Sequence, residues 1–205
     1  NGEVLFGHLR LEARDIADLR DATTGAYVRL DRLLRRLGYP CRLRMWNFVS
    51  RINDGEGDNE RYRQFSHGRH NALALLPGFE PDLPAATAIG TQDSGMTVYF
   101  LAAREPGEQI ENPRQVSAFR YPAVYGPGSP SFSRATLKHW NDGIHLFVSG
   151  TASVVGHQSQ HPGDALAQLD ETYCNFEALL QEAAARKPSA GPFHAAALKI
   201  FVRRD

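Results

Sequence analysis

Two distant segments of the chain repeat one pattern, and this repetition constrains the fold more than any other feature. "AYVRLDRLLRRL" (26–37) aligns without gaps on "TYCNFEALLQEA" (172–183), with Tyr27 opposite Tyr173. After a short loop each segment is followed by an apolar run, "LRMWNFVSRIND" in the first case and "LKIFVRRD" in the second. Two helix-then-strand units of one pattern predict a duplicated α+β fold. The alternative is that two amphipathic helices resemble each other by chance.

Hydrophobic periodicity predicts the remaining elements. Tyr27, Leu30, Leu33, Leu34 and Leu37 form one helical stripe, and Gly38 is suited to end that helix. Segment 121–135 is rich in Pro, Gly and Ser and is expected to be a loop. The expected strands are 4–11, 41–54, 87–91, 96–104, 144–155 and 193–204, and the expected helices are 21–38, 60–76 and 163–186.

Composition excludes several classes of protein. The 205 residues are 42% apolar and 22% charged, as in a globular chain. The formal net charge is zero, whereas a nucleic-acid binder needs a basic excess. No apolar run approaches the roughly 20 residues that cross a bilayer, and no signal peptide opens the chain. Cys41 and Cys174 are far apart and lack metal-site spacing, which predicts a reduced, cytoplasmic protein.

Two histidine pairs raise the question of a metal site. "HGRH" contains His67 and His70, and "HQSQH" contains His157 and His161. The second pair follows a strand, precedes "PGD" and lacks the glutamate of a zinc-protease motif. We therefore expect turn or surface histidines, with no metal and no cofactor. Ser149 lies outside a G-x-S-x-G elbow, and "GPGSPS" lacks the lysine of a phosphate-binding loop.

Arginines and small residues give a more specific indication of a site. Arg69 shares a helical stripe with Tyr62 and Phe65, which predicts a buried guanidinium that needs an anion. A guanidinium can bind a carboxylate through two parallel hydrogen bonds. The anion is either a structural Asp or Glu or a small organic acid. The candidate carboxylate binders are Arg61, Arg63, Arg69 and Arg120.

The stretch "VSGTAS" places small residues where an apolar strand would be expected to continue. Ser149, Gly150 and Thr151 would let a ligand approach the backbone and would offer hydroxyl groups to it. We interpret these three residues as the floor of a binding site. A β-bulge without a ligand is the alternative.

The second half of the chain resembles the RidA/YjgF family, which has a chorismate-mutase-like α+β fold. The resemblance rests on "LFVSGTASVV", then "GDALAQLDETYCNFEALL", then "LKIFVRR", and its helix supplies Gln168, Asn175 and Leu179. The resemblance implies a RidA-like domain over 111–205, preceded by a related α+β half over 1–110. Members of this family form trimers with clefts between subunits, so it implies a homotrimer, or a monomer if the two halves pack together.

A broader resemblance covers nearly the whole chain. "MWNFVSRIND", "ERYRQFSHGRHNA", "PAATAIGT", "RQVSAFRYPAVYGPGSPSFSRA" and "VSGTASVVGH" look like the chorismatases, often labelled pteridine-dependent dioxygenases. This implies cleavage of chorismate to pyruvate plus 3-hydroxybenzoate, 4-hydroxybenzoate or a dihydroxycyclohexadiene carboxylate. It also implies that Tyr121 and Tyr125 are walls of the pocket. A RidA-like module that only binds small acids and a RidA-type imine deaminase are the alternatives.

One departure from the family concerns the catalytic acid. In the chorismatases this acid is a glutamate in a C-terminal segment similar to "CRxDLLVEIE", and no such segment occurs here. The chain is therefore expected to be the central part of a chorismatase, truncated at its C-terminus, and no catalytic residue is assigned. A Gly or Ala near position 150 separates 3-hydroxybenzoate producers from hydrolytic members, so Gly150 implies 3-hydroxybenzoate.

Overall fold

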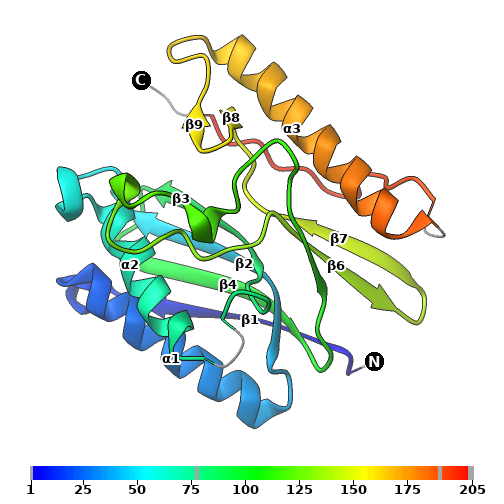
Figure 1. The fold of residues 1–205 in the computed structure, drawn as a ribbon. Helices are drawn as coiled ribbons and strands as arrows, with labels where there is room; N and C mark the ends of the chain where they lie inside the picture. Colours follow the sequence, from blue (N-terminus) through cyan, green and yellow to red (C-terminus); the bar gives the residue numbers. More distant parts are fainter. Residues whose placement is uncertain (1, 77–78, 189–190, 203–205) are drawn as a thin grey trace.

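The computed structural model describes residues 2–76, 79–188 and 191–202 (Figure 1). It has mixed α and β structure, with helices on both sides of the strands. The strands are β1 (Val4–Leu11), β2 (Cys41–Ser50), β3 (Ala85–Thr91), β4 (Met96–Ala103), β5 (Glu108–Ile110), β6 (Ala135–Trp140), β7 (Gly143–Val148), β8 (Val154–Val155) and β9 (Gln158–Ser159). The α-helices are α1 (Leu19–Leu37), α2 (Arg61–Ala74) and α3 (Ala165–Arg186), and short 3-10 turns are η1 (Ala13–Ile16), η2 (Gly57–Asn59), η3 (Ala118–Arg120) and η4 (Ala123–Tyr125).

The first half is a four-stranded sheet with two helices on one face (Figure 1). The strand order is β1-β4-β2-β3, in which only β2 and β3 run parallel. Residues that alternate along β2 point toward the helices, so Met45 and Val49 are fully buried with Leu34 of α1 and Phe65 of α2. The parallel pairing leaves β3 at an edge of the sheet, beside the second half.

Helix α1 begins and ends where its sequence indicates. The Asp18 carboxylate accepts a hydrogen bond from the Asp21 N–H at 2.9 Å, and Gly38 has the left-handed conformation with φ of 79°. The expected stripe is only partly buried, because Leu33 and Leu37 are 37% and 47% exposed. The sheet covers the side of α1 that carries Tyr27, so the two outer leucines turn away from it.

Two glycines in the helices of this half should respond in opposite ways to alanine. A Cβ on Gly68 would lie 2.2 Å from the Arg20 carbonyl oxygen of α1, whereas a Cβ on Gly25 would have no neighbour within 4 Å. We expect Gly68→Ala to lower the free energy of unfolding by about 2 kcal/mol through overpacking. Gly25→Ala should raise it by up to about 1 kcal/mol through helix propensity. Urea denaturation measures both changes, and equal midpoints would contradict the close helix contact.

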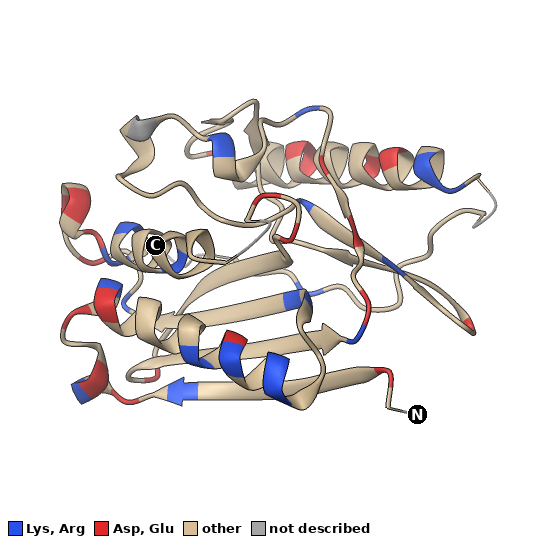
Figure 2. Ribbon diagram, turned by 60° about the horizontal axis from the view of Figure 1, so that its bottom comes forward, with Lys and Arg blue, Asp and Glu red and all other residues tan. Residues whose placement is uncertain are grey.

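The second half packs a three-stranded sheet, β5-β6-β7, against α3. Ile110, Leu137 and Leu179 are buried between them. This sheet joins the first one at the start of β3, where the Gly150 N–H donates to the Ala86 carbonyl at 3.0 Å. Helix α3 lies on the opposite side of the molecule from α1 (Figures 1 and 2).

Two expected strands are corrected by the structure. The strand predicted over 144–155 ends at Val148, and only Val154–Val155 pairs again as β8. The strand predicted over 193–204 is not formed in its described part, 193–202, and 203–204 lie outside the described residues. Ile200 and Val202 are 63% and 77% exposed, and among the described residues no strand pairs with this segment.

The two segments of the internal repeat differ in their buried faces. Tyr27 is 3% exposed and its counterpart Tyr173 is 61% exposed. Leu179 is 1% exposed, whereas its counterpart Leu33 faces solvent. The gapless alignment therefore pairs residues that point in different directions, although both segments are helical as expected.

The surface carries both signs of charge. In Figure 2 the basic and acidic segments are dispersed over both halves, and α1 carries both. Among the described residues, no helix combines the length and the apolar composition that crossing a membrane requires.

Candidate functional site

Arg69 of α2 is a buried cation that forms no ion pair with any of the described residues. Its side chain is 3% exposed, and its Nε and Nη2 atoms have no hydrogen-bond partner among the described residues. The guanidinium carbon lies 5.5 Å from the centre of the Tyr27 ring, a contact that supports the charge only weakly. A buried guanidinium with two free donors is expected to bind an anion.

Arg134 is a second buried arginine, located just before β6. Its Nη2 donates to the Val116 carbonyl at 2.7 Å and to the Tyr121 hydroxyl at 2.9 Å, while its Nε has no partner in the described part of the chain. The Glu111 carboxylate accepts from the Arg134 backbone N–H at 3.2 Å and leaves Oε2 unpaired. Burial raises the pKa of Glu111, and the hydrogen bond with Ser117 and the charge of Arg134 oppose that rise.

Arg44 of β2 is the third buried arginine. Its Nη1 donates to the Met45 carbonyl at 2.8 Å, and its Nη2 donates to the Thr87 hydroxyl at 2.5 Å. Its guanidinium lies 4.8 Å from the Trp46 ring centre. Burial, followed by the nearby charge of Arg69, lowers the pKa of Arg44 to about 9.

These three residues, Arg44, Arg69 and Arg134, form what we call the arginine cluster. Arg69 lowers the pKa of Arg44, and the charges of Arg69 and Arg134 both act on the buried Tyr62 hydroxyl. Burial dominates and raises the pKa of Tyr62. Within the described ranges no carboxylate lies within 4.0 Å of any cluster guanidinium, although fourteen other ion pairs meet that limit. The cluster is therefore suited to a ligand with more than one negative charge.

The other three predicted arginines lie outside the cluster. Arg63 pairs with Asp58 and Glu60, both at 3.4 Å, and Arg120 is exposed and pairs with Glu80 at 3.3 Å. Arg61 donates to the Ser50 carbonyl at 3.0 Å and lines a separate hollow of about 420 Å³. Their helical or loop positions direct them to nearby partners. Of the four predicted arginines, Arg69 is the one that has buried donors without a hydrogen-bond partner among the described residues. That Arg61, Arg63 and Arg120 bind a substrate carboxylate stays a prediction.

The two predicted tyrosines stand side by side. Tyr121 lies 5.3 Å from Tyr125 between ring centres, and its hydroxyl accepts from Arg134. Tyr125 is 37% exposed and its hydroxyl donates to the His157 carbonyl at 2.7 Å. Tyr121 therefore borders the arginine cluster, whereas Tyr125 links the loop to the segment after β8.

The three predicted floor residues lie next to β3, but the hydroxyl groups of Ser149 and Thr151 form hydrogen bonds with backbone groups of the chain. The Ser149 hydroxyl donates to the Ser133 carbonyl at 2.5 Å and accepts from the Ala86 N–H at 2.7 Å. The Thr151 hydroxyl donates to the Ser149 carbonyl at 3.1 Å. Gly150 is exposed, and a Cβ there would lie 3.2 Å from Thr87. Ser149 and Thr151 therefore shape the turn, and Gly150 is the exposed residue of the three, whose role as a binding-site floor stays a prediction.

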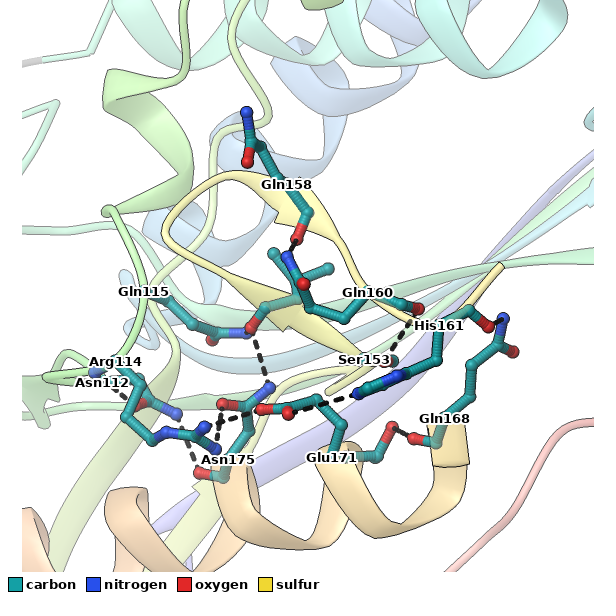
Figure 3. A network of polar contacts seen from close by, with 12 residues as sticks. Asn112, Arg114, Gln115, Ser153, Gln158, Gln160, His161, Gln168, Glu171 and Asn175 are labelled. Atoms are coloured by element: carbon teal, nitrogen blue, oxygen red, sulfur yellow. Dashed lines mark hydrogen bonds and ion pairs between the residues drawn. The ribbon is translucent and has the colours of Figure 1, made fainter. Parts of the chain in front are cut away.

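Helix α3 holds this segment from below through a polar network (Figure 3). The Asn175 amide donates to the carbonyls of Ala152 and Val154 at 2.9 and 2.8 Å. Arg114 donates to the Asn175 amide oxygen at 3.0 Å and lies 2.7 Å from Glu171. These bonds tie the carbonyls of Ala152 and Val154 to α3.

The histidines have roles in packing and turns. A Cβ on Gly128 would lie 2.8 Å from the His67 Cα, so the 121–135 loop packs closely on α2. The His157 ring lies 3.0 Å from the Tyr125 hydroxyl, and the His161 ring lies 3.7 Å from Glu171. In the part of the chain that the structure describes, no three His, Cys, Asp or Glu side chains are grouped as metal ligands would be.

Sequence reasoning missed Arg44 and Arg134, which complete the cluster. Arg44 is next to the buried Met45 in the alternating run "CRLRMWNF". Because neighbouring residues of a strand point to opposite faces, the pattern assigns Arg44 to the outer face of the sheet. Arg134 stands in "SFSRA" within a loop and carries no periodic signal. Neither pattern reveals that the second half covers these positions.

Comparisons with known proteins all find similarity to chorismatases or to a 3-hydroxybenzoate synthase. Residues 1–102 match the family model described as "Chorismatase FkbO/Hyg5-like, N-terminal". The chain is 42% identical to a 3-hydroxybenzoate synthase of Streptomyces hygroscopicus over 90% of this chain and 57% of that protein. It is 40% identical to a chorismatase of the same organism, over 98% of this chain and 59% of that protein.

A solved structure is also similar. A chorismatase crystal structure matches with a TM-score of 0.84 and 38% identity, over 94% of this chain and 59% of that one. The chain thus spans less than two thirds of the length of these relatives.

Proposed function

This chain belongs to the chorismatase family, and we propose that it cleaves chorismate to pyruvate and 3-hydroxybenzoate. The observation that carries the proposal is the arginine cluster, whose three buried guanidiniums have no carboxylate partner among the described residues. Chorismate is a dicarboxylate, and bidentate binding by arginine would orient both of its ends.

The reaction requires one proton and one bond cleavage. Protonation of the methylene carbon of the enolpyruvyl ether creates an oxocarbenium-like centre, and pyruvate then leaves. Attack of the ring's own 4-hydroxyl oxygen on the carbon that pyruvate leaves, followed by cleavage of the original C4–O bond and loss of the C3 proton, gives 3-hydroxybenzoate without net uptake of water. Capture of one water instead gives the dihydroxycyclohexadiene carboxylate. The residues of this chain would bind the carboxylates and exclude water, and none is assigned as the acid.

The domain organisation is part of the same proposal. We assign 1–110 to an N-terminal α+β half and 111–205 to a RidA-like half. The division is supported by α3, where Gln168 and Asn175 form hydrogen bonds and Leu179 is buried. The change of sheet lies close to the proposed boundary, because β5 (Glu108–Ile110) begins the second sheet just before residue 111. The protein would act as a monomer or a RidA-like homotrimer. The free thiols of Cys41 and Cys174 support a cytoplasmic location.

The proposal is tested by incubating the protein, at its natural length, with chorismate. Pyruvate is followed with lactate dehydrogenase, and the ring product is identified by chromatography. Pyruvate with 3-hydroxybenzoate in equal amounts is the expected result. Tight chorismate binding without pyruvate would favour a binding module, and ammonia release from an imino acid would favour a deaminase.

Gly150 should influence which product is formed. Its Cβ position is 3.2 Å from Thr87, so a methyl group there would narrow the exposed floor. We expect Gly150→Ala to raise the share of the dihydroxycyclohexadiene carboxylate at least about threefold, because a shift of less than 1 kcal/mol between two barriers suffices. Chromatography of the products checks this, and an unchanged ratio would contradict a role of Gly150 in product choice.

A further inference from the structure

The Thr87 side chain occupies the space that a side chain at position 150 would need. A Cβ on Gly150 would lie 3.2 Å from Cγ2 and 3.3 Å from Oγ1 of Thr87, tighter than ordinary van der Waals contact. Gly150 is not among the residues with positive φ, so its backbone accepts alanine without strain. The side chain of Thr87 is therefore what limits the residue at position 150.

Thr87 cannot turn away freely. Its hydroxyl accepts from Arg44 Nη2 at 2.5 Å, and its carbonyl accepts from the Asn47 amide at 2.9 Å. Threonine is branched at Cβ, which restricts its rotamers further. Asn47 in turn accepts a hydrogen bond from the Tyr27 hydroxyl at 2.5 Å, so the position of β3 is tied to α1.

Arg44 is held as firmly as the threonine that it binds. It is 7% exposed, donates to the Met45 carbonyl and stacks over Trp46. Arg69 repels it, and among the described residues its side chain has no carboxylate within 4.0 Å. The bond to Thr87 is thus one of the few contacts that keep this cation in place, and any shift of Thr87 moves Arg44 as well.

We propose that Thr87, held by Arg44, is a specificity-determining partner of Gly150, and that the three residues act as one unit that sets the shape of the floor. The part of this inference that concerns the reaction products rests on the proposed function. The coupling between the residues rests on the geometry alone. A methyl group at position 150 would displace Thr87, and this displacement would move Arg44, a member of the arginine cluster.

A double-mutant cycle tests the unit. Gly150→Ala alone should lower kcat/KM for chorismate about tenfold, through overpacking against Thr87. Thr87→Ser removes Cγ2 and keeps the hydroxyl that Arg44 needs, so adding it to Gly150→Ala should restore activity to within about threefold of the starting protein. The product ratio should return with it. Thr97→Ser on β4 makes the same chemical change away from the floor and should restore nothing.

Thermal unfolding of the starting protein, the single variants Gly150→Ala and Thr87→Ser, their double variant and the Thr97→Ser control separates this inference from the proposed function. Non-additive shifts in Tm for Gly150→Ala and Thr87→Ser would confirm the coupling whether or not chorismate is cleaved. Additive shifts, with the Thr97→Ser control behaving like Thr87→Ser, would overturn it. Coupled stability in an active enzyme whose product ratio stays constant in every variant would overturn the specificity role.

Discussion

Replacing Arg69 with methionine should lower kcat/KM for chorismate at least about 100-fold. Methionine has a similar length and apolar character but no charge, so the substrate carboxylate would lose a buried, charge-assisted partner, which costs about 3 kcal/mol or more. Steady-state kinetics of pyruvate release, with kcat and KM determined separately, measures the change. A loss confined to KM would indicate that Arg69 binds substrate and transition state equally.

The same substitution should leave the folded protein at least as stable. Nε and Nη2 of Arg69 have no partner among the described residues, so removing the guanidinium breaks none of their hydrogen bonds and removes a buried charge. Arg14→Met is the matched control, because the Arg14 side chain is 87% exposed and its ion pair with Asp15, at 3.9 Å, lies at the surface. An Arg69→Met protein that is active but less stable would mean that the arginine is structural.

Asn175→Ala should lower the free energy of unfolding by about 3 kcal/mol. Asn175 is fully buried and donates to two carbonyls while it accepts from Arg114. Alanine would leave these groups buried without partners, and each such group costs about 1–3 kcal/mol. Urea denaturation measures the change through its midpoint and slope.

Cys174→Ala is the control for that variant. Cys174 is the preceding residue of α3, and its side chain is exposed. Its replacement should change stability by less than about 0.5 kcal/mol. If both variants behaved alike, the network in Figure 3 would contribute nothing to holding the floor.

The order of the sequence motifs was enough to predict the family, but it predicted only some of the residues in the candidate site. The stripe that contains Tyr62 and Phe65 predicted a buried Arg69, and the structure confirms the burial. Arg61 and Arg63 stand in the same motif and are equally basic. Their carbonyl and carboxylate partners come from the turn between β2 and α2, so only three-dimensional contacts distinguish them from Arg69.

Local sequence determined the elements whose signals are local. Asp18, Gly38 and Asp164 mark helix ends because a side chain or a left-handed residue satisfies the backbone groups there. Alternation over 4–11 and 96–104 predicted β1 and β4 for the same reason, since each strand has one face against the core.

Tertiary structure decided what depends on residues far away in the chain. The apolar run from 144 looks like one strand, yet Asn175 of α3 takes the carbonyls of Ala152 and Val154. Likewise 193–202 has the composition of a strand but pairs with none of the described strands, because pairing needs a free edge and not only propensity. The same holds for Arg69. Its residue type can be read from the sequence, whereas the lack of a counter-charge among the described residues around it is a property of the folded chain.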